Sequence, residues 1–114
     1  MRESAQAILN DKGRSFIGSA FLYLETMPKA IHHRNASEAE FYRTFFDNVQ
    51  IWIGNVELIV TIATEESERS GLAAMDALHV AAAYLGKAEV FLTTENSRKS
   101  IHRTSLVRVV SIQP

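Results

Sequence analysis

The apolar positions of the chain follow two spacings, one typical of helices and the other typical of strands. Apolar residues three to four positions apart predict amphipathic helices over residues 1–12, from Ser19 onward, over 37–49, and between Asn55 and Gly71. Short runs rich in β-branched and aromatic residues predict strands at SFIGSA, VQIWI, EVFLTT and LVRVVSI. Helices that alternate with strands in this way indicate an α/β fold with a short, mainly parallel sheet.

Polar residues at the ends of the predicted helices indicate where several of them begin or break. Ser19 is placed to cap the helix that follows it, and Ser37 with Glu40 forms a capping-box pattern. Pro28 predicts a kink or a break in the helix after Ser19. In the helix from Asn55, the apolar face is expected to comprise Val56, Ile59, Val60 and Ala63, with Glu65, Glu66 and Glu68 facing solvent.

The run GLAAMDALHVAAAYLGKAEVFLTTEN contains the most unusual pattern of the chain. Its composition predicts a buried helix, yet Asp76 and His79 interrupt the apolar residues, and the following strand ends at Glu95. Glu25 lies six residues beyond Ser19, where the first predicted strand ends. Because ligands of parallel α/β sheets bind outside the carboxyl ends of the strands, we expect these three carboxylates to converge at one edge.

Converging carboxylates need a neutralising partner. Two of them at about 4 Å repel by roughly 4 kcal/mol when the effective dielectric constant is near 20. A proton, a basic side chain or a divalent cation would relieve this repulsion. The chain has no cysteine that could provide a thiolate ligand, and carboxylate oxygens are the ligands that Mg²⁺ and Mn²⁺ prefer. Such ions can bind phosphate oxygens and activate water, so the pattern favours metal-assisted phosphoryl chemistry.

Each of these side chains also has a structural explanation. Asp76 is placed near a helix start, where the helix dipole favours an acid. Glu25 has the position of an exposed helix charge, and Glu95 that of a turn or cap residue. His79 lies one turn after Asp76 and is interpreted as a buried histidine whose hydrogen bonds are satisfied.

Length and composition narrow the class of protein. The 114 residues form a single expected domain, 1–114, of ordinary apolar content. A net charge of −1 argues against a generally basic nucleic-acid binder. The absence of cysteine fits a reducing cytoplasm, and no apolar run approaches the roughly 20 residues that span a bilayer. We therefore expect a soluble cytoplasmic protein.

The region around these carboxylates resembles the PIN domain family. The family's DALH helix is matched fully at 76–79, and its strand ending in Thr-Thr-Asp is matched at 93–95 with Glu in the place of Asp. Upstream, SAFLYLE at 19–25 is similar to the family's Ser followed six residues later by a metal-site Glu, and the closing strand LVRVVSI also fits. The resemblance covers nearly all of the chain.

This resemblance implies a three-layer α/β/α fold and a ribonuclease activity. By analogy, Glu25, Asp76 and Glu95 would be the catalytic residues and would hold one or two Mg²⁺ or Mn²⁺ ions that activate water to cut RNA. Thr94 would help to position the site. Many family members are toxins of toxin–antitoxin pairs, so RNA and an antitoxin protein are the implied partners.

The chain departs from the family pattern in three places. It lacks the leading strand that carries an Asp, so it reads as N-terminally shortened. Glu95 replaces an Asp, and Ser97 stands where a further acid is often found. Without the first acid, catalysis is expected to be reduced or lost, and the alternative is a non-catalytic PIN-like domain that acts as a dimeric binding module.

The absent strand also has a structural consequence. In the family it lies in the middle of the sheet, so its neighbours would be left with unpaired backbone groups at about 1–3 kcal/mol each. The remaining strands would close up, a second copy of the chain would provide the missing element, or the natural product would begin upstream of Met1. We favour the second of these, in which the chain forms a homodimer.

A modest basic strip near the carboxylates would contact phosphates or simply be solvated. It comprises Arg98, Lys99, His102, Arg103 and Arg108.

Overall fold

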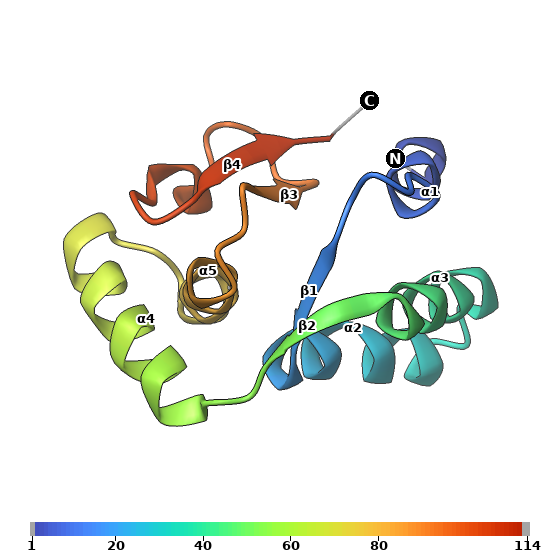
Figure 1. Cartoon of the computed structure of the whole chain (residues 1–114), viewed down its shortest axis with the longest axis horizontal. Coiled ribbons are helices and arrows are strands. Elements are labelled where there is room, and N and C mark those ends of the chain that lie inside the picture. The colour runs from blue at the N-terminus through green and yellow to red at the C-terminus, as the bar shows by residue number, and fades with distance from the viewer. Residues whose placement is uncertain (1, 113–114) are drawn as a thin grey trace.

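Helices and strands alternate along the chain in this computed structural model, as the sequence pattern predicts (Figure 1). The structure describes residues 2–112, with side chains described from residue 5 onward. In chain order the elements are α1 (Arg2–Leu9), β1 (Phe16–Ser19), α2 (Ala20–His32), α3 (Ala36–Asp47), β2 (Val49–Ile53), α4 (Val56–Ser70), α5 (Ala74–Leu85), β3 (Val90–Thr93), the 3₁₀ helix η1 (Ser100–Arg103) and β4 (Arg108–Ser111). The predicted α/β class and parallel strand pairing are confirmed.

The four strands form two separate parallel pairs. β1 pairs with β2, so that Ile17 lies opposite Ile51, and β3 pairs with β4, so that Phe91 lies opposite Val109. Within residues 2–112, no strand joins β1 to β3. The expected single sheet is therefore divided, and the remaining strands have not closed up.

Helix α5 occupies the centre of the molecule and packs against both strand pairs. Figure 1 shows it end-on, between β1–β2 and β3–β4. Val80 and Ala81 are fully buried, and the cluster that contains them is covered by Ile53 of β2 and Phe91 of β3. Small side chains on α5 let its backbone approach its neighbours closely, which explains why a run of alanines forms the main core.

A second, smaller core joins α2 to α3. Met27 and Ala30 of α2 pack on Ala39 of α3, with Tyr42 and Phe46 at the border. Helix α2 continues through its internal proline, so the predicted break there is wrong. None of the helices in the described part of the chain has the length and apolar character that a membrane crossing requires.

The caps at the helix starts confirm one sequence prediction and correct another. Ser19 caps α2, because its hydroxyl accepts a hydrogen bond from the backbone N–H of Leu22 at 3.2 Å. Helix α3 starts at Ala36, since Asn35 accepts from the N–H of Glu38 and donates its amide to the Glu38 carboxylate. The predicted box from Ser37 is therefore wrong, because Asn35 is the N-cap residue, and its side chain both accepts from the Glu38 N–H and donates to the Glu38 carboxylate.

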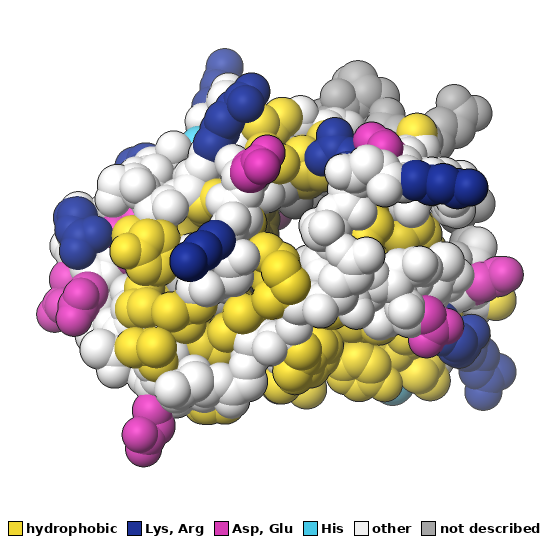
Figure 2. Space-filling model, in the orientation of Figure 1, with side chains coloured by type: hydrophobic (Ala, Val, Ile, Leu, Met, Phe, Trp, Pro, Cys, Tyr) yellow, Lys and Arg dark blue, Asp and Glu magenta, His cyan; other side chains and the backbone are white. Residues whose placement is uncertain are grey.

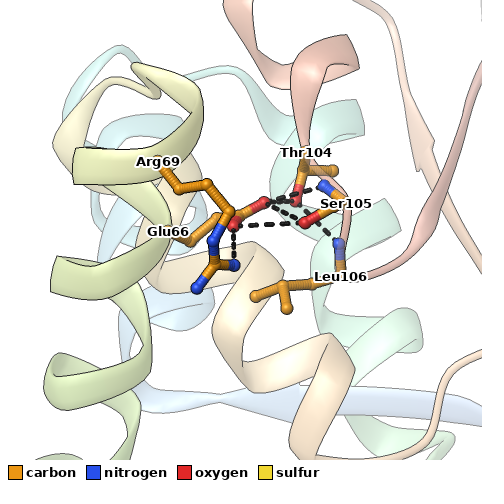
Figure 3. A network of polar contacts seen from close by, with 5 residues as sticks. All are labelled: Glu66, Arg69, Thr104, Ser105 and Leu106. Carbon is orange, nitrogen blue, oxygen red and sulfur yellow. Dashed lines mark hydrogen bonds and ion pairs between the residues drawn. The ribbon is translucent and has the colours of Figure 1, made fainter.

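Of the three α4 glutamates predicted to face solvent, Glu65 and Glu68 are exposed, but the side chain of Glu66 is completely buried. Figure 3 shows its carboxylate between Arg69 and the segment that follows η1. The carboxylate accepts from the Thr104 hydroxyl, from the Ser105 N–H at 2.8 Å and from the Arg69 guanidinium at 2.7 Å. The Thr104 hydroxyl oxygen in turn accepts from the N–H of Leu106. Glu66 thereby ties α4 to the chain leading into β4.

Burial and hydrogen bonding shift the pKa of Glu66 in opposite directions. Burial alone raises the pKa of this carboxyl group, but the hydrogen bonds from Thr104 and Ser105 and the charge of Arg69 outweigh it. The net result is a pKa lowered from the ordinary value of 4.5. The buried group is therefore ionised at neutral pH, and its charge is compensated within the network.

Gly71 ends α4 in the left-handed region, with φ of 69°, and we expect Gly71→Ala to destabilise the protein by about 1–2 kcal/mol. A Cβ there would also come within 3.2 Å of the Arg103 guanidinium, which donates to the carbonyls of Ser70 and Gly71. Gly54→Ala is the matched control, because the nearest atom to its added Cβ is 3.9 Å away. Urea unfolding of both variants measures the difference; equal free energies of unfolding would contradict the strain at Gly71.

Candidate functional site

Asp76 lies in the first turn of α5, at the polar end of an otherwise buried helix. Ala73 precedes the helix as its N-cap residue and provides no side-chain cap. Asp76 is partly buried, while Ala77, the next residue, is almost fully buried. The buried face of α5 therefore holds Asp76 in place, and the helix dipole favours its negative charge.

Glu25 and His79 meet across the interface between α2 and α5. The Nε2 atom of His79 lies 3.2 Å from Oε1 of Glu25. His79 is buried at 7% exposure, whereas the Glu25 side chain is 33% exposed. Glu25 is therefore held by a contact with a residue that is distant in sequence. The structural explanation considered from the sequence, an exposed helix charge without such a contact, does not describe it.

His79 differs from the fully satisfied histidine that the sequence suggested. One ring nitrogen contacts Glu25, but the other, Nδ1, is buried with no hydrogen-bond partner among the described residues. The sequence indicated that His79 lies near Asp76, because residues three positions apart share one face of a helix. Its partner on α2 could not be recognised, since 54 residues separate the two in sequence.

Glu95 follows β3 and is exposed. Its N–H donates to the Thr93 hydroxyl at 3.0 Å, and its carbonyl oxygen lies 3.2 Å from Nε2 of His102. These contacts involve the backbone of Glu95 and fix the turn after β3. They agree with the structural explanation of Glu95 as a turn or cap residue. Its carboxylate nevertheless acts on Asp76, as the electrostatics below show.

The pKa of Asp76 depends on burial and on three nearby charged or titratable side chains, two of which are the other predicted carboxylates. Partial burial raises the pKa of Asp76 above its ordinary value of 3.8; the interaction with His79 lowers it, and the charges of Glu25 and Glu95 raise it further. Glu25 also raises the pKa of Tyr42 on α3, after burial and Glu38. Glu25 and Glu95 therefore contribute to the raised pKa of Asp76, after burial and His79, although the three carboxyl groups come from distant segments.

The donor chemistry of this neighbourhood suits a hard cation, but the donors are not tightly gathered. Within the described part of the chain, no three His, Asp or Glu side chains converge closely enough to form a metal site. Mg²⁺ is commonly held by only one or two carboxylates, with water and substrate phosphates as its other ligands.

The predicted basic strip is only partly available for a ligand. Arg103 donates to the carbonyls of Ser70 and Gly71 and so fixes the connection between α4 and α5. His102 contacts the carbonyl of Glu95. Arg98 and Lys99 are exposed in the turn between β3 and η1 and remain the better candidates for phosphate contact.

Comparisons with protein-family models, curated proteins and solved structures gave no match. Function is therefore inferred from the residues of the chain itself. The strongest of these observations is the perturbed carboxyl group of Asp76, because such perturbation concentrates at functional sites.

The raised pKa of Asp76 predicts that Asp76→Asn stabilises the protein in metal-free buffer at pH 7. The folded state takes up a proton at Asp76 more readily than the unfolded state does, so ionisation of Asp76 opposes folding above the folded pKa. The thermal midpoint in EDTA should therefore rise, and the gain should shrink as the pH falls below that pKa. Glu57→Gln, which removes a first-turn acid from α4, controls for the helix dipole. A lower midpoint for Asp76→Asn than for that control would contradict the prediction.

Proposed function

We propose that the chain is a PIN-like α/β/α domain protein that cleaves RNA weakly with the help of Mg²⁺ or Mn²⁺. The observation that carries this proposal is the 3.2 Å contact between Glu25 on α2 and His79 on α5, because His79 lies one helical turn from Asp76. The contact brings carboxylates from two distant segments to the same part of the fold, where burial, followed by Glu25 and Glu95, raises the pKa of Asp76. Mutually repelling carboxylates at the end of a buried helix are an arrangement that a divalent cation stabilises. The DALH and TTE patterns at 76–79 and 93–95 support the same assignment.

Glu25 and Asp76 would hold the ion, and Glu95 would add negative charge beside it. When bound, the ion would supply charge stabilisation for the scissile phosphate and a more acidic water. His79 fixes the Glu25 carboxylate through the 3.2 Å contact and so acts as a positioning residue. Arg98 and Lys99 in the neighbouring turn would attract the phosphate backbone.

A non-catalytic PIN-like module is the second candidate. The observation that favours it is that residues 2–112 place no three metal-type side chains together. In this case the same domain would act by binding a partner. An antitoxin, RNA and a second copy of the chain are the partners we propose for the two candidates.

Exposed apolar side chains on α4 support the homodimer. Figure 2 shows hydrophobic side chains gathered over the region of α4, and Val56, Leu58 and Val60 are each more than 40% exposed. Covering them would remove apolar surface from water. Sedimentation equilibrium tests this proposal, and a monomer at high micromolar concentration would contradict it.

Cleavage of single-stranded RNA by the purified chain separates the two candidates. The nuclease proposal predicts cleavage in Mg²⁺ or Mn²⁺ that stops in EDTA and returns when the ion is restored. A binding module predicts no cleavage under either condition. RNA cleavage that persists in EDTA would contradict the metal-dependent mechanism.

A further inference from the structure

A cavity of about 500 Å³ lies between the two strand pairs. Its walls include β1 on one side and residues 90–92 of β3 on the other. In the orientation of Figure 1, the surface is hollowed between the parts of the molecule that carry these strands (Figure 2). We call this cavity the slot.

The strands β1 and β3 run in the same direction along the slot. Beyond the end of β1, Glu25 contacts His79 in the first half of α5 at 3.2 Å. Beyond the end of β3, the chain reaches Arg103 of η1, which donates to the carbonyls of Ser70 and Gly71 just before α5. At the other end of α5, a Cβ on Gly86 would come within 2.8 Å of Ile17 in β1, and β3 begins at Val90. Both strands therefore run antiparallel to α5 and parallel to each other.

Each of these strands has one edge in use and one edge facing the slot. β1 is paired only with β2, and β3 only with β4, within the described residues. The second edge of each strand carries backbone N–H and C=O groups that have no strand partner. A single extended segment in the slot would offer hydrogen-bond partners to both edges.

The slot is lined mainly by apolar side chains. Ile8 and Leu9 of α1, Phe45 of α3, and Ala82 and Ala83 of α5 contribute to its walls. A strand with helices packed around it is typically a continuous apolar run. The occupant that fits is therefore an apolar β-strand of about five residues.

The polar groups of the slot define the two ends of its occupant. At the end where β1 and β3 begin, the slot is lined by Lys87, Glu89 and Arg14, and Arg14 is ion-paired with Asp11 at 3.4 Å. At the other end, His79 lines the slot, and its buried Nδ1 has no partner among the described residues. An acidic residue before the strand and an uncharged donor after it would match these ends, whereas a second acid would add to the repulsion around Asp76.

We propose that the slot binds one extended apolar strand of a partner protein, which runs parallel to β1 and β3 and joins the two pairs into one five-stranded sheet. Backbone hydrogen bonds to both edges supply the recognition, as in other cases where a peptide adds a strand to a sheet. The proposal does not depend on metal binding or on RNA cleavage.

The probe is a capped hexapeptide, Glu-Val-Ile-Val-Val-Ser, added to the full chain. It should raise the thermal midpoint and slow hydrogen exchange at amides of both β1 and β3. The control peptide Glu-Val-Pro-Val-Pro-Ser lacks two backbone donors and should bind at least about tenfold more weakly. Equal binding of the two peptides would overturn strand addition.

Ala83→Leu tests the location of binding, because it adds bulk from α5 into the slot. It should raise the dissociation constant of the peptide at least about tenfold, while Ala36→Leu, the same change at an exposed site on α3, should not. Circular dichroism verifies that both variants fold; if Ala83→Leu does not, the exchange pattern in the parent chain decides.

Three results would overturn the proposal. The first is exchange protection only on β2 or β4, which would place the peptide at an outer edge. The second is an unchanged thermal midpoint at millimolar peptide. The third is a dimer whose β1 and β3 amides are already protected, which would show that a second copy covers the slot.

Discussion

Replacement of Glu66 by alanine is expected to lower the free energy of unfolding by about 3 kcal/mol, which is a large part of the stability of a typical domain. The change would leave the buried Ser105 N–H and the Thr104 hydroxyl without their acceptor. It would also open a cavity between α4 and the chain leading into β4. Urea unfolding followed by circular dichroism measures the loss.

The neighbouring Glu65 provides a matched control, because it is exposed on the same helix. Glu65→Ala removes the same number of atoms and should change the free energy of unfolding by less than about 0.5 kcal/mol. A similar small effect for Glu66→Ala would show that the network in Figure 3 contributes little.

The lowered pKa of Glu66 gives this network a pH signature. A carboxyl group with a depressed folded pKa contributes stability above its unfolded pKa, and this stability is lost as the pH falls through the folded value. The protein should therefore lose stability in acid below about pH 4.5, the ordinary value for Glu. Glu66→Gln should lose less over the same range, and identical pH profiles would contradict the assignment.

Asp76→Asn is expected to lower metal-dependent RNA cleavage at least about 100-fold. The amide is uncharged and is a poorer ligand for Mg²⁺ or Mn²⁺, while its size hardly changes. The substitution should also abolish the rise in thermal midpoint that the ion gives to the parent chain. Initial rates at saturating metal measure the first effect, and thermal unfolding with and without the ion measures the second.

Glu40→Gln is the control for this prediction, since Glu40 is an exposed carboxylate on α3. It should keep both the cleavage rate and the thermal response to the ion. Because Asp76→Asn is purified in the same way, a copurifying nuclease would leave its rate unchanged. An unchanged rate would therefore show that the cleavage does not come from a site that contains Asp76.

The sequence predicts most helices and strands because their signals are local. The strand at 49–53 has a clear β-rich run, and Ser19 and Asn55 cap the helices that follow them. Gly71 ends α4 in a conformation that glycine adopts readily. These features depend on neighbouring residues, which the sequence places side by side.

The features that sequence reasoning missed depend on contacts between distant segments. Glu66 is followed two residues later by another glutamate, and only the folded chain brings Thr104 to it. His79 likewise meets Glu25 only because α2 packs on α5. The division of the strands into two pairs has the same origin, because no local pattern indicates which strand edges remain unpaired.

The convergence of carboxylates was the prediction with the widest consequences, and it remains a prediction. Glu25 and Glu95 both act on Asp76, as sheet topology suggested. The side chains do not gather into a closed metal cage within the described residues. Under the proposed function, the ion would therefore be held partly by a phosphate ligand.

The pKa of Asp76, measured by carbon-detected NMR titration, tests the shared site most directly. Asp76 should titrate above 3.8 in the parent chain, its pKa should fall toward that value in Glu25→Gln, and Mg²⁺ should lower it in the parent chain. A titration of Asp76 at its ordinary pKa that neither Glu25→Gln nor Mg²⁺ alters would contradict a common site.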